Sequence, residues 1–285
     1  LLSGITVGSL YALIAIGYTM VYGILRLINF AHGDIFMMAG FFMVYISASM
    51  PMAVAIPVVL IMTVALGLLI ERAAYKPLRS APRMSVMISA IGVSYLLQNL
   101  ATYITGGLAR PYPEIPFLKG TFMLGALKIK IITVVTPLLT ILLVIALVLF
   151  INHTKTGMAM RAVSRDFDTA RLMGIKVNNI ISVTFIIGSF LAGVGSILYF
   201  SNYGQVSPTI GAMPGLKAFV AAVFGGIGSI PGAVLGAYII GICESLIKAN
   251  DAIAIFSNAF TFALLILVLL FKPNGMFGEK LAEKV

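Results

Sequence analysis

The side chains that most enzymes use for catalysis are sparse in this sequence, and their spacing excludes the familiar sites. The two histidines, His32 and His153, are far apart, and neither lies in an HExxH or HxxxH spacing, so we expect no catalytic metal. There is one cysteine, Cys243, and no GxSxG nucleophile elbow. No GxxxxGKS/T phosphate loop is present, since the nearest glycine cluster, at residues 225–229, lacks the lysine. We therefore expect no catalytic residue and no ATPase site in this chain.

Three polar side chains interrupt an otherwise apolar stretch. Asn29, His32 and Asp34 all fall within residues 27–35. Ionisable groups among apolar helices are costly, and they usually face a cavity or one another. Either His32 and Asp34 cap the ends of a broken helix or pair with Arg26, or the three side chains line a path through the protein. Both interpretations are open at this stage.

The longest polar passage, residues 157–175, carries the start and stop signals of a short helix. In chain order these signals are Ser164 as N-cap, Asp166 and Asp168 in the first turn, Arg171 in the last turn and Gly174 as a left-handed C-cap residue. The pattern predicts a self-contained helix over residues 165–173.

An apolar stripe runs across this predicted helix and the turn before it. Met160, Val163, Phe167 and Ala170 follow helical spacing, and charged residues occupy the remaining faces. Such a segment is either an amphipathic helix at the membrane surface or a short rigid helix that docks on another protein. The capping signals favour the docking helix.

Composition assigns the chain to a broad class. It is 60% hydrophobic and 10% charged, with a mean hydropathy of +1.09, whereas soluble domains carry about 25% charged residues. Apolar runs of roughly 17–25 residues recur, and lipid leaves such runs no alternative to the helix. We predict an all-α polytopic membrane protein. The net charge of +10 does not indicate nucleic acid, because no basic cluster is interleaved with aromatics.

The apolar runs predict about eight or nine transmembrane helices. Broken or re-entrant segments are expected near residues 27–36 and 216–232, where polar residues or glycine and proline interrupt the runs. Two short segments around a Gly/Pro break are typical of transporters, so Gly225, Gly226 and Gly228 are candidates for a gate or for close helix packing. Lys217, Glu244 and Lys248 are expected at the interface, with long side chains reaching toward water and a Glu-to-Lys pair at i, i+4.

Positive charge indicates the orientation. Thirteen of the nineteen lysines and arginines lie in four segments: Arg26, a polar loop expected at residues 71–83, residues 152–178 and the C-terminal tail. The positive-inside rule places these segments in the cytoplasm, with the N-terminus and the loop at about residues 106–130 outside. The sequence starts within an apolar run without a basic n-region, so we expect no signal peptide.

Motifs along the whole chain resemble one family. The stretch TGMAMRAVSRDFDTARLMGI (156–175) looks like the cytoplasmic coupling loop of the permease subunits of ABC importers for branched-chain amino acids. The same family is suggested by GYTMVY (17–22) with INFAHGD (28–34), by KAFVAAVFGGIGSIPG (217–232) and by KPNGMF (272–277). Within that family the chain looks most like the first of two paired permeases.

The resemblance implies a single permease domain, residues 1–285, in a bacterial cytoplasmic (inner) membrane. It implies a second permease subunit, identical or different, two cytoplasmic ATPase subunits that hold ATP and magnesium, and an extracytoplasmic substrate-binding protein. The family's coupling helix maps onto Ser164, Arg165, Asp166, Phe167, Asp168, Ala170, Arg171 and Gly174. The translocation path is expected at Asn29, His32, Asp34, Gly225, Gly226 and Gly228.

Two alternatives stay open on the sequence. Related permeases carry urea or short amides and share much of the pattern. An ion-coupled secondary transporter would also explain broken helices, but it needs intramembrane charges, for which Asp34 is the principal candidate.

Overall fold

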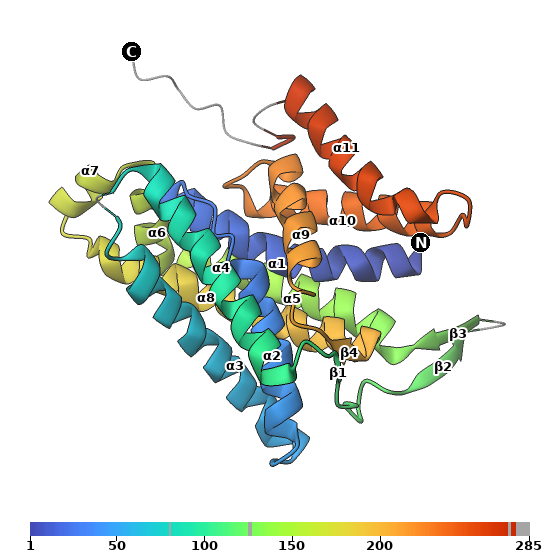
Figure 1. Ribbon diagram of the computed structural model, residues 1–285. Coiled ribbons are helices and arrows are strands. Elements are labelled where there is room, and N and C mark those ends of the chain that lie inside the picture. The colour runs from blue at the N-terminus through green and yellow to red at the C-terminus, as the bar shows by residue number, and fades with distance from the viewer. Residues whose placement is uncertain (80, 125–126, 273–274, 278–285) are drawn as a thin grey trace.

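The computed structural model describes residues 1–79, 81–124, 127–272 and 275–277, with elements labelled in Figure 1. Seven helices in these ranges are long and apolar enough to cross a membrane. They are α1 (Leu2–Leu25), α3 (Met52–Ile70) with the π-helical turn η1 (Glu71–Tyr75), α4 (Arg83–Thr105), α5 (Ile131–His153), α8 (Val177–Tyr203), α10 (Ile230–Lys248), and η2 (Ala254–Phe256) with α11 (Ser257–Phe271). The all-α, multi-pass prediction is confirmed.

Two shorter apolar helices, α2 (His32–Ser47) and α9 (Ala212–Gly225), lie next to the predicted interruptions: α2 follows the first and α9 precedes the second. The chain leaves α1 at Arg26 and re-enters a helix at His32, and it leaves α9 at Gly226 and starts α10 at Ile230. Both breaks therefore lie where the sequence predicts them. Whether α2 and α9 each cross the bilayer decides the number of crossings, which stays a prediction.

The polar connections hold the remaining elements. α6 (Lys155–Arg165) and α7 (Phe167–Leu172) follow α5. β2 (Thr121–Leu124) and β3 (Leu127–Lys130) form an antiparallel hairpin, and β1 (Arg110–Pro111) pairs with β4 (Gln205–Val206). The hairpin was not predicted, although its second strand, LKIK, alternates apolar and polar residues as strands do.

α1 is the central helix. In its most apolar window 89% of residues are buried, against 17% in α5 and 11% in α11, so those two helices leave their surfaces for lipid. α1 packs against α8, α9 and α10. Gly4 and Gly8 let α1 approach α10 closely, because a Cβ on Gly8 would lie 2.8 Å from the Tyr238 Cα of α10.

The segment after α3 corrects one expectation. Residues 71–83 were predicted as a polar loop, yet the helix continues through η1 and buries Glu71 completely. The carboxylate tolerates burial because it pairs with Arg79 and accepts a 3.0 Å hydrogen bond from Ser182 Oγ. Burial lowers the pKa of the Arg79 guanidinium, against the opposing effect of Glu71.

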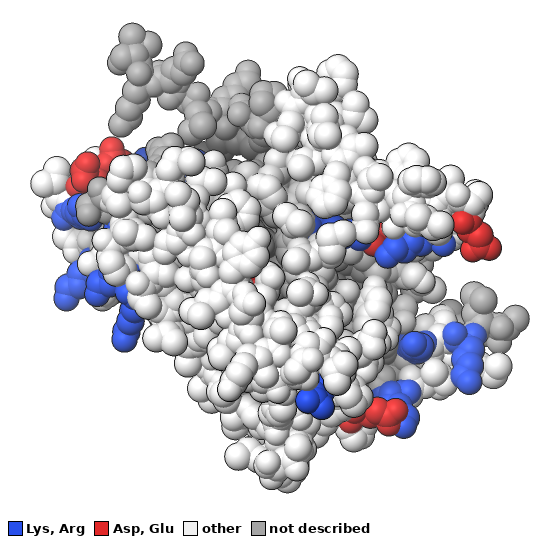
Figure 2. All heavy atoms as spheres, in the orientation of Figure 1, with Lys and Arg blue, Asp and Glu red and all other residues white. Residues whose placement is uncertain are grey.

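Charged side chains gather at two opposite ends of the molecule and leave the face between them almost uncharged (Figure 2). Contacts bring the three arginine-rich segments together at one end: Arg26 reaches Ser164, and Arg79 reaches Asn178. At the other end, β1 and β4 join the loops after α4 and α8. Residues 278–285 of the predicted cytoplasmic tail lie outside the described residues.

Candidate coupling segment and translocation path

The coupling segment is two helices rather than one. α6 starts at its N-cap Thr154, whose Oγ accepts a hydrogen bond from Gly157 N at 3.0 Å, and runs to Arg165. Asp166 then adopts an extended backbone and caps α7, its Oδ1 accepting from the amides of Asp168 at 2.8 Å and Thr169 at 3.0 Å.

The predicted N-cap was therefore wrong by two residues. Ser164 lies inside α6 and donates its hydroxyl to the Arg161 carbonyl oxygen at 2.8 Å, so it is committed to the helix that ends there. Arg165 belongs to that same helix, and Asp166 is the cap rather than a first-turn residue.

The other end of α7 agrees with the sequence. Gly174 has a φ of +81°, and the amide of Ile175 donates to the carbonyl of Ala170 at 3.0 Å, which closes the helix as a Schellman motif does. Arg171 lies in the last turn, 3.9 Å from Asp168. The predicted stripe is also confirmed: Met160, Val163 and Ala170 are buried, and Phe167 packs against the core.

The sequence pattern did not predict the exposed apolar tip of α7. Leu172 is 88% exposed and Met173 is 77% exposed, so two large apolar side chains stand free at the tip of a capped helix. α7 lies at the edge of the molecule, at the left of Figure 1. An apolar tip on a short rigid helix can insert into a groove of another protein.

A chain of contacts connects the α6–α7 junction with the first helix break. Arg26, in the left-handed conformation with a φ of 54°, donates from Nη2 to the Ser164 carbonyl oxygen at 3.3 Å. Within the break, Asn29 Oδ1 accepts from the hydroxyl of Tyr75, in η1, at 2.7 Å. The coupling segment and η1 thus hold the same short segment from two sides.

The polar residues at this break are buried but face different neighbours. The His32 ring packs edge-on against Tyr18 of α1, with ring centroids 4.9 Å apart, and Asp34 accepts from Gln98 Nε2 of α4 at 3.0 Å. Arg26, which was one predicted partner of this cluster, instead reaches Ser164. Among the described residues, Asn29 Nδ2 and His32 Nε2 have no hydrogen-bond partner. Buried polar atoms without a partner are rare and costly.

The glycines at the second break have distinct roles. Gly225 packs on α10, where a Cβ would lie 1.9 Å from the Gly232 carbonyl oxygen. Gly226 and Gly228 have φ values of +107° and +101°, which residues with a Cβ rarely adopt. Ser229 then caps α10 by accepting from Gly232 N at 3.2 Å.

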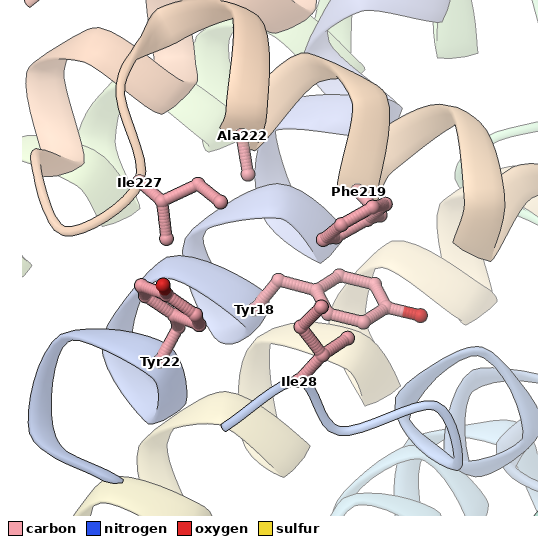
Figure 3. A pocket seen from close by; sticks show the side chains of 6 residues that line it. All are labelled: Tyr18, Tyr22, Ile28, Phe219, Ala222 and Ile227. Atoms are coloured by element: carbon pink, nitrogen blue, oxygen red, sulfur yellow. The ribbon is translucent and has the colours of Figure 1, made fainter. Parts of the chain in front are cut away.

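The two breaks meet at one apolar pocket (Figure 3). Tyr18 and Tyr22 come from α1, Phe219 and Ala222 from α9, Ile28 from the first break and Ile227 from the second. The sequence places these segments about 200 residues apart, so their meeting could not be expected from it. The pair of tyrosines at i, i+4 on α1 was the available signal.

Comparison with known proteins now identifies the family. A family model described as "Branched-chain amino acid transport system / permease component" matches residues 1–269. The chain belongs to this family. Among its relatives, the high-affinity branched-chain amino acid transport system permease protein BraD of Pseudomonas aeruginosa is 42% identical, covering 100% of this chain and 97% of BraD. The corresponding protein LivH of Escherichia coli K12 is 41% identical over 99% of this chain and 96% of LivH.

A more distant relative extends over nearly the same length. The probable branched-chain amino acid transport permease protein LivH of Methanocaldococcus jannaschii is 29% identical over 95% of this chain. As a membrane permease, the chain is a transport subunit and not itself an enzyme. Among the residues the structure describes, no three His, Cys, Asp or Glu side chains are grouped closely enough to hold a metal ion.

The permease also buries charges that the sequence placed at the interface. Glu244 of α10 accepts at Oε1 from Lys248 Nζ, its i+4 partner, and from Lys217 Nζ of α9, each at 2.6 Å. The side chains of Lys217 and Glu244 are 6% and 2% exposed, so the expected reach toward water is wrong for both. Lys248, at 51%, is the one that extends outward.

Proposed function

We propose that this chain is the transmembrane permease subunit of an ATP-driven importer and forms the path for branched-chain amino acids. Similarity at 41–42% identity over essentially the full length to two permeases named for this transport carries the proposal. Energy has to come from outside the chain, since its sequence holds no phosphate loop. ATP and magnesium then belong to two cytoplasmic ATPase subunits, and a second permease and an extracytoplasmic binding protein complete the importer.

α7 is the element proposed to bind the ATPase. It is capped at both ends, is anchored by buried Ala170 and presents an apolar tip at the arginine-rich end. By the positive-inside rule this end lies in the cytoplasm of a bacterial inner membrane, together with the C-terminus. Closure of the ATPase dimer on ATP would displace α7 as a rigid body.

The contacts supply a route from α7 to the path. Arg26 transmits movement of the α6–α7 junction to the first break, which carries Asn29, His32 and Asp34. The pocket of Figure 3 joins that break to the second, at Gly225, Gly226 and Gly228. We assign these six residues to the translocation path, where unwound backbone lets two short helices change their tilt.

Reconstitution tests the function. Proteoliposomes that contain this chain, its paired permease, the ATPases and the binding protein are expected to accumulate leucine, but not urea, when ATP is enclosed. Uptake should survive ionophores that collapse proton and sodium gradients. Leucine uptake by this chain alone, or uptake abolished by the ionophores with ATP present, would refute the proposal.

A further inference from the structure

Four side chains from three helices form a charged cluster inside the helix bundle. Lys217 belongs to α9, Glu244 and Lys248 to α10, and Tyr11 to α1. These three helices pack on one another, as Figure 1 shows. Glu244 accepts from both lysines at Oε1 and from the Tyr11 hydroxyl at Oε2, the latter at 2.9 Å. Both oxygens of the only carboxylate in the cluster are therefore occupied.

The charges of the cluster do not cancel. Two ammonium groups share one carboxylate, so one positive charge is left over. Lys248 is half exposed and can be hydrated, whereas the Lys217 side chain is 6% exposed. Excess charge at depth in a membrane protein is costly and is usually met by a counter-charge.

Lys217 also has unused hydrogen-bond donors. An ammonium group carries three N–H donors, and Glu244 takes one. The Tyr11 ring lies 6.0 Å from Nζ and contributes a cation–π contact. Among the described residues, Nζ has no other hydrogen-bond partner. A buried lysine with spare donors and an uncompensated charge is suited to an anion with two oxygens.

The position of Lys217 connects it with the translocation path. Two residues before it, Gly215 packs on Gly33, where a Cβ would lie 3.0 Å from the Gly33 Cα. Phe219, two residues after the lysine, lines the pocket between the two breaks, but residues two apart on a helix point to opposite faces, so Lys217 itself does not line that pocket. The connection runs through α1: Tyr11, beside Lys217, and Tyr18, in the pocket, are seven residues apart and lie on one face of that helix. α9 ends in the second break itself, so the lysine lies on the helix that a moving break would tilt.

We infer that Lys217 is a cargo-binding residue and takes the α-carboxylate of the amino acid during translocation. A cargo carboxylate makes the cluster electrically neutral, and Lys248 keeps Glu244 paired while Lys217 turns to the cargo. The inference rests on the proposed function and names the part of the cargo that this chain recognises. A plain structural role, in which the pair only clamps α9 to α10, predicts different results.

The first experiment uses the unmodified importer in lipid nanodiscs, without the binding protein, and saturation-transfer NMR to detect weak ligands. Leucine and 4-methylpentanoate, which has the carboxylate but no ammonium, are expected to give saturation transfer. Leucinamide, which lacks the carboxylate, should bind about tenfold more weakly or worse, since charge-assisted hydrogen bonds are the strong ones. Equal signals from leucine and leucinamide would overturn the inference. That result is also the one expected if Lys217 pairs with a carboxylate of the paired permease instead of the cargo.

The second experiment separates cargo binding from clamping. Lys217→Met and Glu244→Gln break the same ion pair, so a clamp predicts parallel losses. Cargo binding predicts divergence: Lys217→Met loses leucine binding by about tenfold or more, whereas Glu244→Gln frees the lysine and keeps binding at or above the wild-type level. Size-exclusion chromatography with the partner subunits reports assembly. If Lys217→Met fails to assemble, Lys217→Arg, which keeps the charge, must retain the preference for leucine over leucinamide, and loss of that preference counts against the inference.

The two proposals fail in different ways. Wild-type importer that accumulates leucine with ATP but shows no carboxylate preference refutes only the role of Lys217. Wild-type importer that does not accumulate leucine refutes the proposed function itself.

Discussion

Asn29 shows how single side chains connect the parts of this permease. Its Oδ1 holds the Tyr75 hydroxyl at 2.7 Å while its Nδ2 has no partner among the described residues, so half of a buried amide is satisfied. The Tyr75 hydroxyl is thus the contact that ties this amide, and with it the first break, to η1.

Tyr75→Phe removes the donor and leaves Asn29 Oδ1 buried without it. That costs about 1–3 kcal/mol, which should loosen the link between η1 and the first break. We expect the complex to assemble and hydrolyse ATP normally while leucine uptake per ATP falls several-fold. Tyr95→Phe, on the exposed surface of α4, is the matched control and should behave as wild type. Unchanged coupling in Tyr75→Phe would remove this contact from the route.

Asp166→Ala removes the side chain that caps α7. Loss of an N-cap costs about 1 kcal/mol, so roughly fivefold weaker binding of the ATPase subunits is expected. Asp166→Ser restores a capping oxygen and should recover most of the affinity. Binding can be measured by titrating labelled ATPase onto permease in nanodiscs. Asp251→Ala, an exposed carboxylate after α10, controls for loss of charge.

At the scale of elements, α2 and α9 differ from the full-length spans because each is short and lies next to a polar or glycine-containing break. Both breaks face α1, since Tyr18 and Tyr22 line the same pocket as Ile28 of the first break and Ile227 of the second. Backbone left unwound at such a depth is stable only where it lines a cavity or is covered by protein. The break after α9 is covered, because the amides of Met276 and Phe277 donate to the carbonyls of Phe224 and Gly225 at 2.9 Å.

Gly226→Ala tests how firmly the second break depends on its backbone. A Cβ at a φ of +107° is strained, at a cost of about 1–3 kcal/mol. We expect a lower thermal midpoint for the solubilised permease and reduced uptake. Gly92→Ala, in α4 with open space around the site, replaces glycine without strain and should be neutral or slightly stabilising. Equal midpoints for the two variants would show that the break can relax.

Local signals explain which elements the sequence predicts. Apolar length and polar, glycine or proline breaks act within a few turns, so the long apolar helices and both breaks agree with expectation. Serine and aspartate are N-cap residues of similar strength. Whether Ser164 or Asp166 caps α7 depends on where α6 ends, and the buried stripe of α6 decides that end. Lys217 and Glu244 are 27 residues apart, and only the packing of α9 on α10 brings them together. Pairings of that kind leave no trace in local composition.

At the scale of the whole molecule, the distribution of charge and the chain topology define the same two opposite ends. Arg26, the loop after η1 and the α6–α7 segment converge at one end, while the β2–β3 hairpin and the β1–β4 pair lie at the other (Figure 1). The uncharged band between them in Figure 2 is the surface that hydrocarbon would cover. If the arginine-rich end is cytoplasmic, α7 and the hairpin must be reachable from opposite sides of the membrane.

Cysteine labelling measures that orientation directly, because the chain has a single natural cysteine, Cys243, that can be replaced by alanine. In this background, Met173→Cys at the exposed α7 tip and Glu114→Cys in the loop between α4 and α5 place one thiol at each end. A membrane-impermeant maleimide should modify the thiol of the Met173→Cys variant only in inside-out vesicles. It should modify the thiol of the Glu114→Cys variant only in spheroplasts. Detergent should expose both equally. The reverse pattern would put α7 outside the cell, where no ATPase could reach it, and would overturn the coupling assignment together with the orientation.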